Sequence, residues 1–444
     1  MSGQCAALGA AGVAPAASAP DSGVALEGRG FAVTVLVVSE THLVRGPQGH
    51  IYSRAGVDGY DFWRRYLDVF EHVVVAARTG PAWRCDDLLP VEGPGVRVAP
   101  LPEYAGPWGY LRIRRRLARA MMGALSEADV LCLRAPGPIA GLAWRRRGSR
   151  PFGIEVVGDP LDALSPGAVR SVARPLARRA LTRELRRMCI EAEAVAYVTE
   201  SALQRRYPTG SWSTSYSSID LGAAAFVSDA EVARRVAAEW RVAKGTPANP
   251  WHLVSVASLT QLYKGTDVLI DAVARCRDRG LELTLTIVGD GRCRSALEAR
   301  ARARAVQAQV RFAGHLTAGA AVRAAIDRAD LFVLASRSEG LPRAVIEAMA
   351  RAVPCIGSRV GGMAELLPNE RLVRPGDAGA LADAITYFCS ASTDFAAVAH
   401  RDLAVARRYH AGVLRPRRIR FYQRLRAAAD AMCSDRRACL VAHG

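Results

Sequence analysis

Residues 331–350 read Leu-Phe-Val-Leu-Ala-Ser-Arg-Ser-Glu-Gly-Leu-Pro-Arg-Ala-Val-Ile-Glu-Ala-Met-Ala. The apolar run Leu331–Leu334 predicts a buried parallel strand. The segment from Ser338 to Pro342 predicts a turn and the entry to a helix, with Pro342 near the first helical position. Glu339 then lies at the mouth of that helix, and Glu347 lies about two turns inside it, on a face roughly 80° further round the axis.

This junction suits a ligand that carries both hydroxyl groups and phosphate. Each carboxylate can accept hydrogen bonds from a pair of vicinal hydroxyls. The helix N-terminus between them can receive an anion, because its free N–H groups and its dipole favour negative charge. A nucleotide sugar offers both kinds of group. The alternative is an ordinary loop glutamate at Glu339 and a solvated glutamate on a helix face at Glu347.

The surrounding residues favour the first interpretation. The segment closely resembles the signature of the retaining family-4 glycosyltransferases, E-G-x-P-x(4)-E-A-M-A with Pro and Gly-Gly downstream. The matching positions are Glu339, Gly340, Pro342, Glu347, Ala348, Met349, Ala350, Pro354, Gly361, Gly362 and Glu365. The resemblance is strong over Val254–Cys389 and weaker over Phe31–Asp220. It implies the α/β GT-B fold, in which two Rossmann-like doubly wound domains face a cleft and a C-terminal helix crosses back to the first domain.

Strands alternate with helical stretches in both halves of the chain, which independently predicts two parallel sheets with helices on both faces. The expected strands are Phe31–Val38, Val73–Ala77, Val130–Leu133, Gly153–Val157, Ala194–Val198, His252–Ala257, Leu283–Val288, Val310–Phe312, Leu331–Leu334, Pro354–Ile356 and Leu372–Val373. The expected segments are a disordered leader (1–30), an acceptor-binding domain (31–221), a linker region (222–250), a nucleotide-sugar-binding domain (251–399), a C-terminal helix (400–432) and a flexible tail (433–444).

Composition limits the class of protein. Half of the 444 residues are hydrophobic, as in globular proteins, and no apolar stretch reaches the roughly 18 residues of a transmembrane helix. Ten cysteines are scattered without C-x-x-C or metal-ligand spacing. Such a pattern is typical of small buried residues in a reducing cytoplasm.

The chain is strongly basic, with a formal net charge of +18 and 60 basic residues, of which only Lys244 and Lys264 are lysine. Arginines cluster within Arg112–Arg119, Arg145–Arg147 and Arg170–Arg187. An anionic membrane surface and nucleic acid are both partners for such clusters, while a solvated basic face or arginine-rich codon usage is the alternative. We expect no nucleic-acid partner, because no aromatic and basic module or zinc spacing accompanies the charge.

Two residues of the pattern bear on the donor phosphates. An ammonium at Lys264, just before a predicted helix, can neutralise a diphosphate leaving group, and the family also has Lys-Gly at this place. The family's arginine six residues earlier is replaced here by Ser258. Arg343 and Arg337 are the candidates to supply the second phosphate cation.

The resemblance implies the remaining donor contacts. Glu339 would contact the donor sugar near its transferred carbon, and Glu347 would hold the ribose hydroxyls. Glu365 would support the loop of Gly361 and Gly362, where glycine permits close backbone approach. The other expected donor-binding positions are Gly289, Asp290, Gly314, Gly340, Leu341 and Pro342. No metal and no cofactor are implied, since the nucleotide diphosphate sugar is a co-substrate.

The acceptor site is expected in the first domain. The loop from Gly46 to Gly49 resembles the family's glycine-containing loop. Related enzymes often carry a histidine after the strand that corresponds to Gly153–Val157, where this chain has Asp159. Asp159 is therefore a candidate to orient the acceptor hydroxyl or to stabilise an oxocarbenium-like transition state. A turn-capping aspartate is the alternative.

These features predict a cytoplasmic, hexosyltransferase-like retaining enzyme. It would move a sugar from a nucleotide diphosphate sugar to a hydroxyl of a glycan or lipid-linked acceptor in bacterial cell-surface polysaccharide or glycolipid assembly. A peripheral position on the inner face of the cytoplasmic membrane is a further expectation. The alternatives are another GT-B enzyme, such as a sugar-nucleotide epimerase or a glycan phosphorylase, and a non-catalytic basic protein that binds nucleic acid. The base, the sugar and the linkage stay open.

Overall fold

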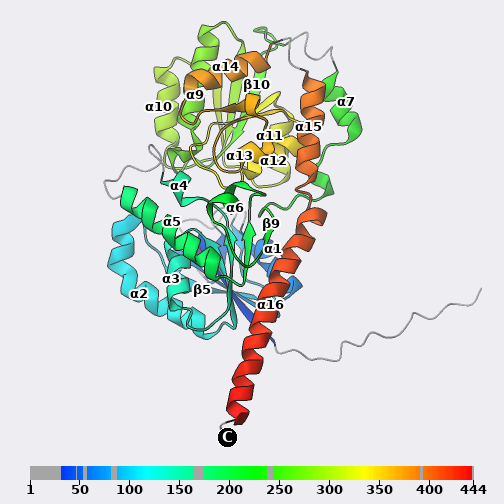
Figure 1. The fold of residues 1–444 in the computed structure, drawn as a ribbon. Coiled ribbons are helices and arrows are strands. Elements are labelled where there is room, and N and C mark those ends of the chain that lie inside the picture. Colours follow the sequence, from blue (N-terminus) through cyan, green and yellow to red (C-terminus); the bar gives the residue numbers. More distant parts are fainter. Residues whose placement is uncertain are drawn as a thin grey trace, which may run out of the picture. The chain divides into compact units, whose positions relative to one another are not determined.

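The computed structural model describes residues 32–46, 48–53, 58–81, 88–164, 174–237, 244–390 and 394–442. The expected leader, residues 1–30, lies outside this part of the chain, as does Arg170 of the third arginine cluster. Two sheets with helices packed on them make up the described chain (Figure 1). We call residues 32–221 the first half and residues 251–390 the second half. The predicted architecture of two doubly wound α/β units is confirmed.

The first sheet has the parallel order β5-β3-β1-β6-β7-β8-β9, and the short strands β2 and β4 attach antiparallel at the end of β1. Its strands are β1 (Thr34–Arg45), β2 (Ile51–Ser53), β3 (His72–Pro81), β4 (Leu89–Pro90), β5 (Val96–Pro102), β6 (Val130–Ala135), β7 (Phe152–Val156), β8 (Ala194–Tyr197) and β9 (Trp212–Ser215). The five strands predicted here are confirmed. The sequence did not predict β5 and β9, because β5 contains two prolines and β9 is mostly serine and threonine, so neither shows an apolar run.

Helices cover both faces of the first sheet. One face carries α2 (Gly106–Ser126), α3 (Pro138–Arg146) and α5 (Arg174–Glu191). The opposite face carries α1 (Tyr60–Trp63), which continues as the 3-10 turn η1 (Arg64–Asp68), together with the C-terminal helix. The short helices α4 (Pro160–Ala163) and α6 (Ala202–Arg206) follow β7 and β8.

The second sheet is parallel throughout, in the order β12-β11-β10-β13-β14-β15. Its strands are β10 (Trp251–Val256), β11 (Leu283–Val288), β12 (Val310–Gly314), β13 (Leu331–Leu334), β14 (Cys355–Ser358) and β15 (Leu372–Val373). Its helices and 3-10 turns are η3 (Leu262–Lys264), α9 (Thr266–Asp278), α10 (Arg294–Ala303), α11 (Ala320–Asp327), α12 (Arg343–Ala350), α13 (Met363–Leu366), η4 (Asn369–Arg371) and α14 (Ala378–Phe388). The strand order reverses between β10 and β13, which is where doubly wound sheets form their ligand crevice.

The segment expected to be a linker packs against the second half over the residues that the structure describes. After the 3-10 turn η2 (Ala223–Ala225), the backbone N–H of Val227 donates to Ala350 O at 3.1 Å. Helix α7 (Asp229–Val236) then buries Val232 in an apolar cluster with Leu403. The helix ends at Val236, and residues 238–243 lie outside the described ranges.

The C-terminal region consists of two helices, α15 (Phe395–Arg407) and α16 (Ala411–Ala442). Helix α15 packs on the second half, whereas α16 runs along the first (Figure 1). Leu425 of α16 lies so close to β7 that a Cβ added at Gly153 would be 2.4 Å from its Cδ2. The predicted return of the C-terminal helix to the first half is therefore confirmed.

The sequence predicted that this helix ends at residue 432 and that residues 433–444 form a flexible tail. Both predictions are wrong as far as Ala442, because α16 continues to that residue. The physical reason is that residues 426–442 contain no glycine or proline, the residues that most strongly oppose a helix. No helix in the described ranges is both long enough and apolar enough to cross a bilayer.

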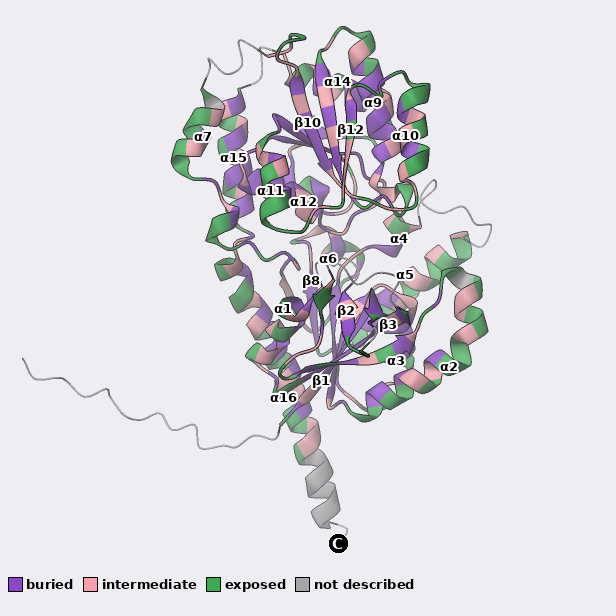
Figure 2. Cartoon of the chain, turned by 180° about the vertical axis from the view of Figure 1, so that it is seen from behind, coloured by how far each residue is buried: buried purple, intermediate pink, exposed green. Residues whose placement is uncertain are grey.

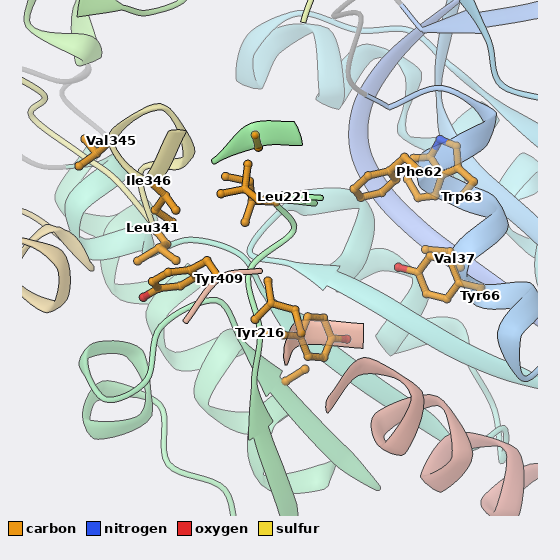
Figure 3. Close-up of a cluster of buried hydrophobic side chains, with 14 of the residues drawn as sticks. Val37, Phe62, Trp63, Tyr66, Tyr216, Leu221, Leu341, Val345, Ile346 and Tyr409 are labelled. Carbon is orange, nitrogen blue, oxygen red and sulfur yellow. The ribbon is translucent and has the colours of Figure 1, made fainter. Parts of the chain in front are cut away.

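One apolar cluster is shared by both halves. It extends from Val37, Trp63 and Tyr66 at the first sheet to Leu341 and Val345 beside the second, and Figure 3 shows Leu341 and Val345 on the same side of the cluster as Leu221 and Tyr409. The strands are buried while the outer helix faces are exposed (Figure 2). Because one core runs between them, the two halves hold the turn at residues 339–342 from both sides.

Candidate active site

The crevice of the second sheet brings together the loops that follow β10 and β13. The loop after β10 contains Ser258 and ends in η3 at Lys264, and the turn after β13 contains Ser336 and Glu339. These two strands are hydrogen-bonded neighbours. Parallel neighbours end at the same edge of a sheet, so residues 75 positions apart in the sequence meet here.

Lys264 and Glu339 form an ion pair at this edge. Nζ of Lys264 lies 2.7 Å from Oε1 of Glu339, and Oγ of Ser336 donates to the same oxygen at 2.6 Å. Burial acts to lower the pKa of Lys264, but the Glu339 carboxylate outweighs burial and the pKa is raised. The lysine is therefore charged at neutral pH. No residue in the described ranges hydrogen-bonds Oε2 of Glu339, which leaves that oxygen for a ligand hydroxyl.

Glycines allow three segments to approach this pair closely. Gly265 has φ +68°, and a Cβ there would lie 1.8 Å from Ala335 O. A Cβ on Gly340 would lie 2.3 Å from Val157 O in the first half, and one on Gly361 would lie 2.0 Å from Glu339 O. Larger side chains at these positions would displace backbone. The expected close approach at Gly361 and the placement of Gly340 beside Glu339 are both present.

Helix α12 begins at Arg343, and Pro342 is its N-cap rather than a residue of its first turn. Glu347 consequently lies about one turn inside the helix, which corrects the predicted two turns. The extended backbone of Pro342, with ψ at 97°, is the local reason, because it keeps the turn before it out of the helix. Burial raises the pKa of Glu347, while Arg343 and Arg323 act to lower it.

The structure distinguishes the two candidates for the second phosphate cation. Arg337 donates to both carboxylate oxygens of Asp267, at 2.7 and 2.8 Å, and to Leu262 O at 2.7 Å. Its charge is therefore already matched. Arg343 is half-buried, has no hydrogen bond or ion pair with any residue in the described part of the chain, and acts electrostatically on both Lys264 and Glu347. Of the two candidates, only Arg343 is left without a carboxylate partner in the described part of the chain.

The turns after β11 and β12 meet at the same edge. Gly289 N donates to Gly314 O at 2.7 Å, and a Cβ on Gly289 would lie 1.9 Å from Ala257 O. Asp290 accepts hydrogen bonds from Gly291 N at 2.7 Å and from Arg294 at 3.0 Å. Ser258, the residue at the missing arginine's position, is exposed and hydrogen-bonds Thr260 at 2.9 Å. These turns therefore lie at the same edge of the second sheet as Lys264 and Glu339.

Asp159 is a capping residue, which corrects the catalytic assignment. Its side chain caps α4 by accepting from Leu161 N at 2.8 Å, accepts from Tyr207 Oη at 2.5 Å and pairs with Arg206. It is 3% exposed. Both carboxylate oxygens are thus engaged within the first half. The proline after Asp159 starts α4, and this local N-cap pattern was the signal for the alternative role.

The loop from Gly46 to Gly49 is the tip of a hairpin. Strand β1 continues past the predicted end at Val38, shifts register between Val38 and His42, and pairs with β2 in antiparallel fashion. Gly49 N donates to Gly46 O at 3.0 Å to close the turn. The parallel pairing of β1 with β6 ends at Val38, whereas its parallel pairing with β3 resumes at His42 and continues to Arg45. The long strand was missed because the polar residues between Val38 and Leu43 interrupt its apolar run.

Glu365 contacts the first half instead of supporting the loop of Gly361. It accepts hydrogen bonds from Glu200 N (2.6 Å), Ser201 N (2.9 Å) and Ala202 N (2.7 Å), and so caps α6. Gly361 N donates to Asp162 of the first half at 3.2 Å. Sequence reasoning missed Asp162, Ser336 and Arg323, because no local pattern distinguishes them from other residues of the same type. Their contacts with residues distant in the sequence are what mark them as part of the site.

This geometry agrees with the comparison to known families. Residues 251–390 match the family described as Glycosyl transferases group 1. The chain therefore contains a glycosyltransferase domain of group 1. Its match to Protein CapJ of Staphylococcus aureus is 23% identical and covers 72% of this chain and 77% of CapJ. Its match to the putative colanic acid biosynthesis glycosyltransferase WcaL of Escherichia coli K12 is 32% identical, and covers 33% of this chain and 38% of WcaL.

Solved structures show the same fold over most of the chain. Sucrose-phosphate synthase from Thermosynechococcus elongatus aligns with a TM-score of 0.66 at 18% identity, covering 89% of this chain and all of that one. Anabaena HepE in complex with UDP and glucose aligns with a TM-score of 0.58 at 19% identity, covering 86% of this chain and 97% of HepE. The chain therefore has the GT-B fold, as its sequence predicted.

Proposed function

We propose that this glycosyltransferase moves a sugar from a nucleotide diphosphate sugar to a hydroxyl of a glycan or lipid-linked acceptor, with retention of configuration at the transferred carbon. The observation that carries the proposal is the charged Lys264–Glu339 pair at the strand-order reversal, with Glu347 one turn inside the adjoining helix. A cation for the diphosphate and two carboxylates for hydroxyls are thus held within one crevice.

Each residue then has a distinct task. Lys264, Arg343 and the N-terminus of α12 stabilise the diphosphate as negative charge develops on it. The free oxygen of Glu339 accepts a hydrogen bond from the donor sugar, and Glu347 accepts from the ribose hydroxyls. The backbone of Gly340–Pro342 contacts sugar and phosphate. In this proposal the protein's own cations meet the leaving group, and no metal or cofactor takes part.

The ion pair between Lys264 and Glu339 also suggests how the site responds to the donor. When the diphosphate binds, Lys264 gains a second anion and Glu339 turns its free oxygen to the sugar. Neither side chain has to move far, because both are held in place by packing and by Ser336. Such preorganisation is the main source of electrostatic stabilisation in enzyme sites.

Polysaccharide biosynthesis is the process that we propose for this enzyme. WcaL is named for colanic acid biosynthesis, and TuaC of Bacillus subtilis, 35% identical over 156 residues, for teichuronic acid biosynthesis. The acceptor would accordingly be a bacterial glycan or its lipid-linked precursor. We further propose that the enzyme works at the cytoplasmic face of an anionic membrane, where the basic first half would meet such an acceptor.

A panel of nucleoside diphosphates tests the donor class. UDP is the first to try, because HepE is in complex with UDP, and GDP and ADP follow. A ligand at 100 times its dissociation constant stabilises the folded state by about 2.7 kcal/mol, which a thermal-shift assay resolves. We expect one of the three to raise the melting temperature of the wild type but not of Lys264→Ala. If none does, the proposed donor class is wrong.

A further inference from the structure

A second polar site lies at the strand-order reversal of the first sheet. Reading along that sheet, the order reverses between β1 and β6, so the carboxyl ends of these strands border a crevice of their own. Arg134 lies near the end of β6, and Glu155 is directly opposite it on β7. Neither residue has a part in the donor site described above.

The carboxylate of Glu155 is fully engaged. It pairs with Arg134 and accepts hydrogen bonds from Tyr66 Oη at 3.2 Å and Tyr216 Oη at 2.8 Å. It is only 3% exposed. Arg65 of η1 lies close enough to Arg418 of α16 to feel its charge. The cluster therefore contains three guanidinium groups, against the carboxylate of Glu155 and that of Asp58, which acts on Arg134.

The two further arginines lack a matching anion. Neither forms an ion pair with any residue in the described ranges, and Nε of Arg65 and both Nε and Nη1 of Arg418 are buried without a hydrogen-bond partner there. Arg418 is 4% exposed. Burial, and then Arg418, lower the pKa of Arg65. Buried charge and buried donors without partners are both costly, so a structure that keeps them points to a missing ligand.

A small recess opens beside these groups. Arg65, Arg134, Glu155 and Tyr216 line its polar part, and the half-buried Val157 and Ser218 lie at its rim. Its volume of about 10 Å³ fits one water-sized atom, such as a single oxygen of a larger oxyanion. Val157 is also the residue whose carbonyl approaches Gly340. The recess therefore adjoins the turn that carries Glu339.

We infer that this recess binds the anionic group, a phosphate or a carboxylate, of the acceptor. The inference rests on the proposed function, which places the acceptor on the first half beside the donor sugar. Arg65 and Arg134 would hold one oxygen of the anion while the rest of the group remains at the rim. The unmatched charge of Arg418 behind them adds to the attraction, because charges in a low-dielectric site interact strongly. A recess filled by water would not balance this charge.

Titration calorimetry with inorganic phosphate and with acetate tests the inference, at an ionic strength held constant with sodium chloride. We expect Arg65→Gln to weaken binding of the preferred anion at least tenfold. The control Arg64→Gln changes the neighbouring arginine, which is exposed and pairs with Asp61, and should bind as the wild type does. Because phosphate could also enter the donor site, all titrations are repeated in the Lys264→Ala background. Equal affinity of Arg65→Gln and the wild type in that background would overturn the inference.

A second measurement needs no variant and so does not depend on how Arg65→Gln folds. Crystals of the wild type in sodium selenate should show an anomalous peak within hydrogen-bond distance of Arg65 and Arg134, and a peak at other sites alone would overturn the inference. The proposed function fails separately, through the nucleotide panel. Arg65→Gln should leave nucleoside diphosphate binding unchanged, because Arg65 has no part in the donor crevice.

Discussion

Glu339 is the residue on which we expect transfer to depend most. Its Oε1 is held by Lys264 and Ser336, so its Oε2 has a fixed direction. We expect Glu339→Gln to reduce the rate of sugar transfer about 10²–10³-fold, the typical cost of losing one oriented electrostatic contact. Initial rates with the donor found by the nucleotide panel measure this. The control Glu370→Gln changes an exposed glutamate and should leave the rate unchanged. Wild-type turnover by Glu339→Gln would refute its assignment.

Lys264 should serve the phosphates rather than the nucleoside. We expect Lys264→Ala to weaken binding of the nucleoside diphosphate much more than binding of the nucleoside, measured by calorimetry. Lys244→Ala is a matched control, because Lys244 also forms a buried ion pair, at 2.9 Å with Asp330. Asp330 lies at the start of β13, the opposite end from the crevice. Equal losses for nucleoside and diphosphate would show that Lys264 does not bind phosphate.

Arg343 should replace the cation that is missing at Ser258. Arg343→Ala is expected to lower diphosphate affinity, since no residue in the described ranges forms a hydrogen bond or ion pair with Arg343. Adding Ser258→Arg to that variant should restore part of the affinity, because it returns a guanidinium to the position that the family uses. Arg337→Ala tests the rejected candidate, and we expect it to reduce stability through the loss of the contact with Asp267. Absence of rescue by Ser258→Arg would leave Arg343 without this role.

At the scale of a single element, helix α2 has two different faces. Leu117 and Met121 pack on the sheet. The outward face nevertheless exposes Trp108, Leu111 and Met122, which are 84%, 49% and 45% accessible. Positions 108, 111, 115, 119 and 122 fall within an arc of about 80°. The helix has five arginines and no acidic residue, so its outer face combines apolar and basic groups as interfacial helices do.

We expect this face of α2 to dock on anionic membranes. Each basic residue near such a surface contributes about 1 kcal/mol, and salt weakens the attraction. Cosedimentation with vesicles should increase with the fraction of anionic lipid and decrease when Arg112, Arg115 and Arg119 become Ser, or when Trp108 and Leu111 become Ser.

A control for that experiment removes the same charge from the second half. Arg302, Arg311 and Arg328 are exposed, and their joint replacement by Ser should leave vesicle binding intact. Equal recovery with neutral and anionic vesicles, or an equal loss in the control, would show that the charge of α2 has no special part in binding.

At the scale of the whole molecule, the described chain is joined by contacts of long sequence separation. Glu365 of α13 caps α6. The hydrogen bond that it accepts from Glu200 N joins residues 165 positions apart in the sequence. Arg408, which follows α15, pairs with Glu200, and Arg415 of α16 pairs with Asp68 at 2.8 Å. These polar contacts lie around the shared apolar cluster. They hold the first half and the second half together.

Glu365→Ala tests this connection. The change leaves three backbone N–H groups at the start of α6 without their acceptor, and each group left without a partner costs about 1–3 kcal/mol where it is buried. We expect a lower denaturation midpoint in urea, and weaker coupling between the halves should broaden the transition or divide it in two. Glu370→Ala, five residues along and exposed, is the control. An unchanged midpoint and slope for Glu365→Ala would mean that the cap does not couple the halves.

The sequence by itself determined the features that depend on neighbours along the chain. The apolar run at Leu331–Leu334, the turn residues around Gly340 and the start of a helix after Pro342 are local choices, because strand, turn and helix signals act within a few residues. Glu339, Lys264 and Glu347 were therefore predicted together. The strands of the second sheet were predicted for the same reason, since parallel strands buried on both faces show continuous apolar runs.

Only the tertiary structure decided which charges are free and which are already matched. Arg337 and Arg343 look alike in the sequence, but Asp267 lies 70 residues from Arg337 and neutralises only that one. The sequence correctly predicted that Asp159 follows a strand. It gave no sign of the hydrogen bond that Asp159 accepts from Tyr207, which lies 48 residues later in the chain. The recess beside Arg65 and Arg134 had no sequence signal at all. Hydrogen bonds and ion pairs depend on distance in space, and the fold alone brings these distant residues together.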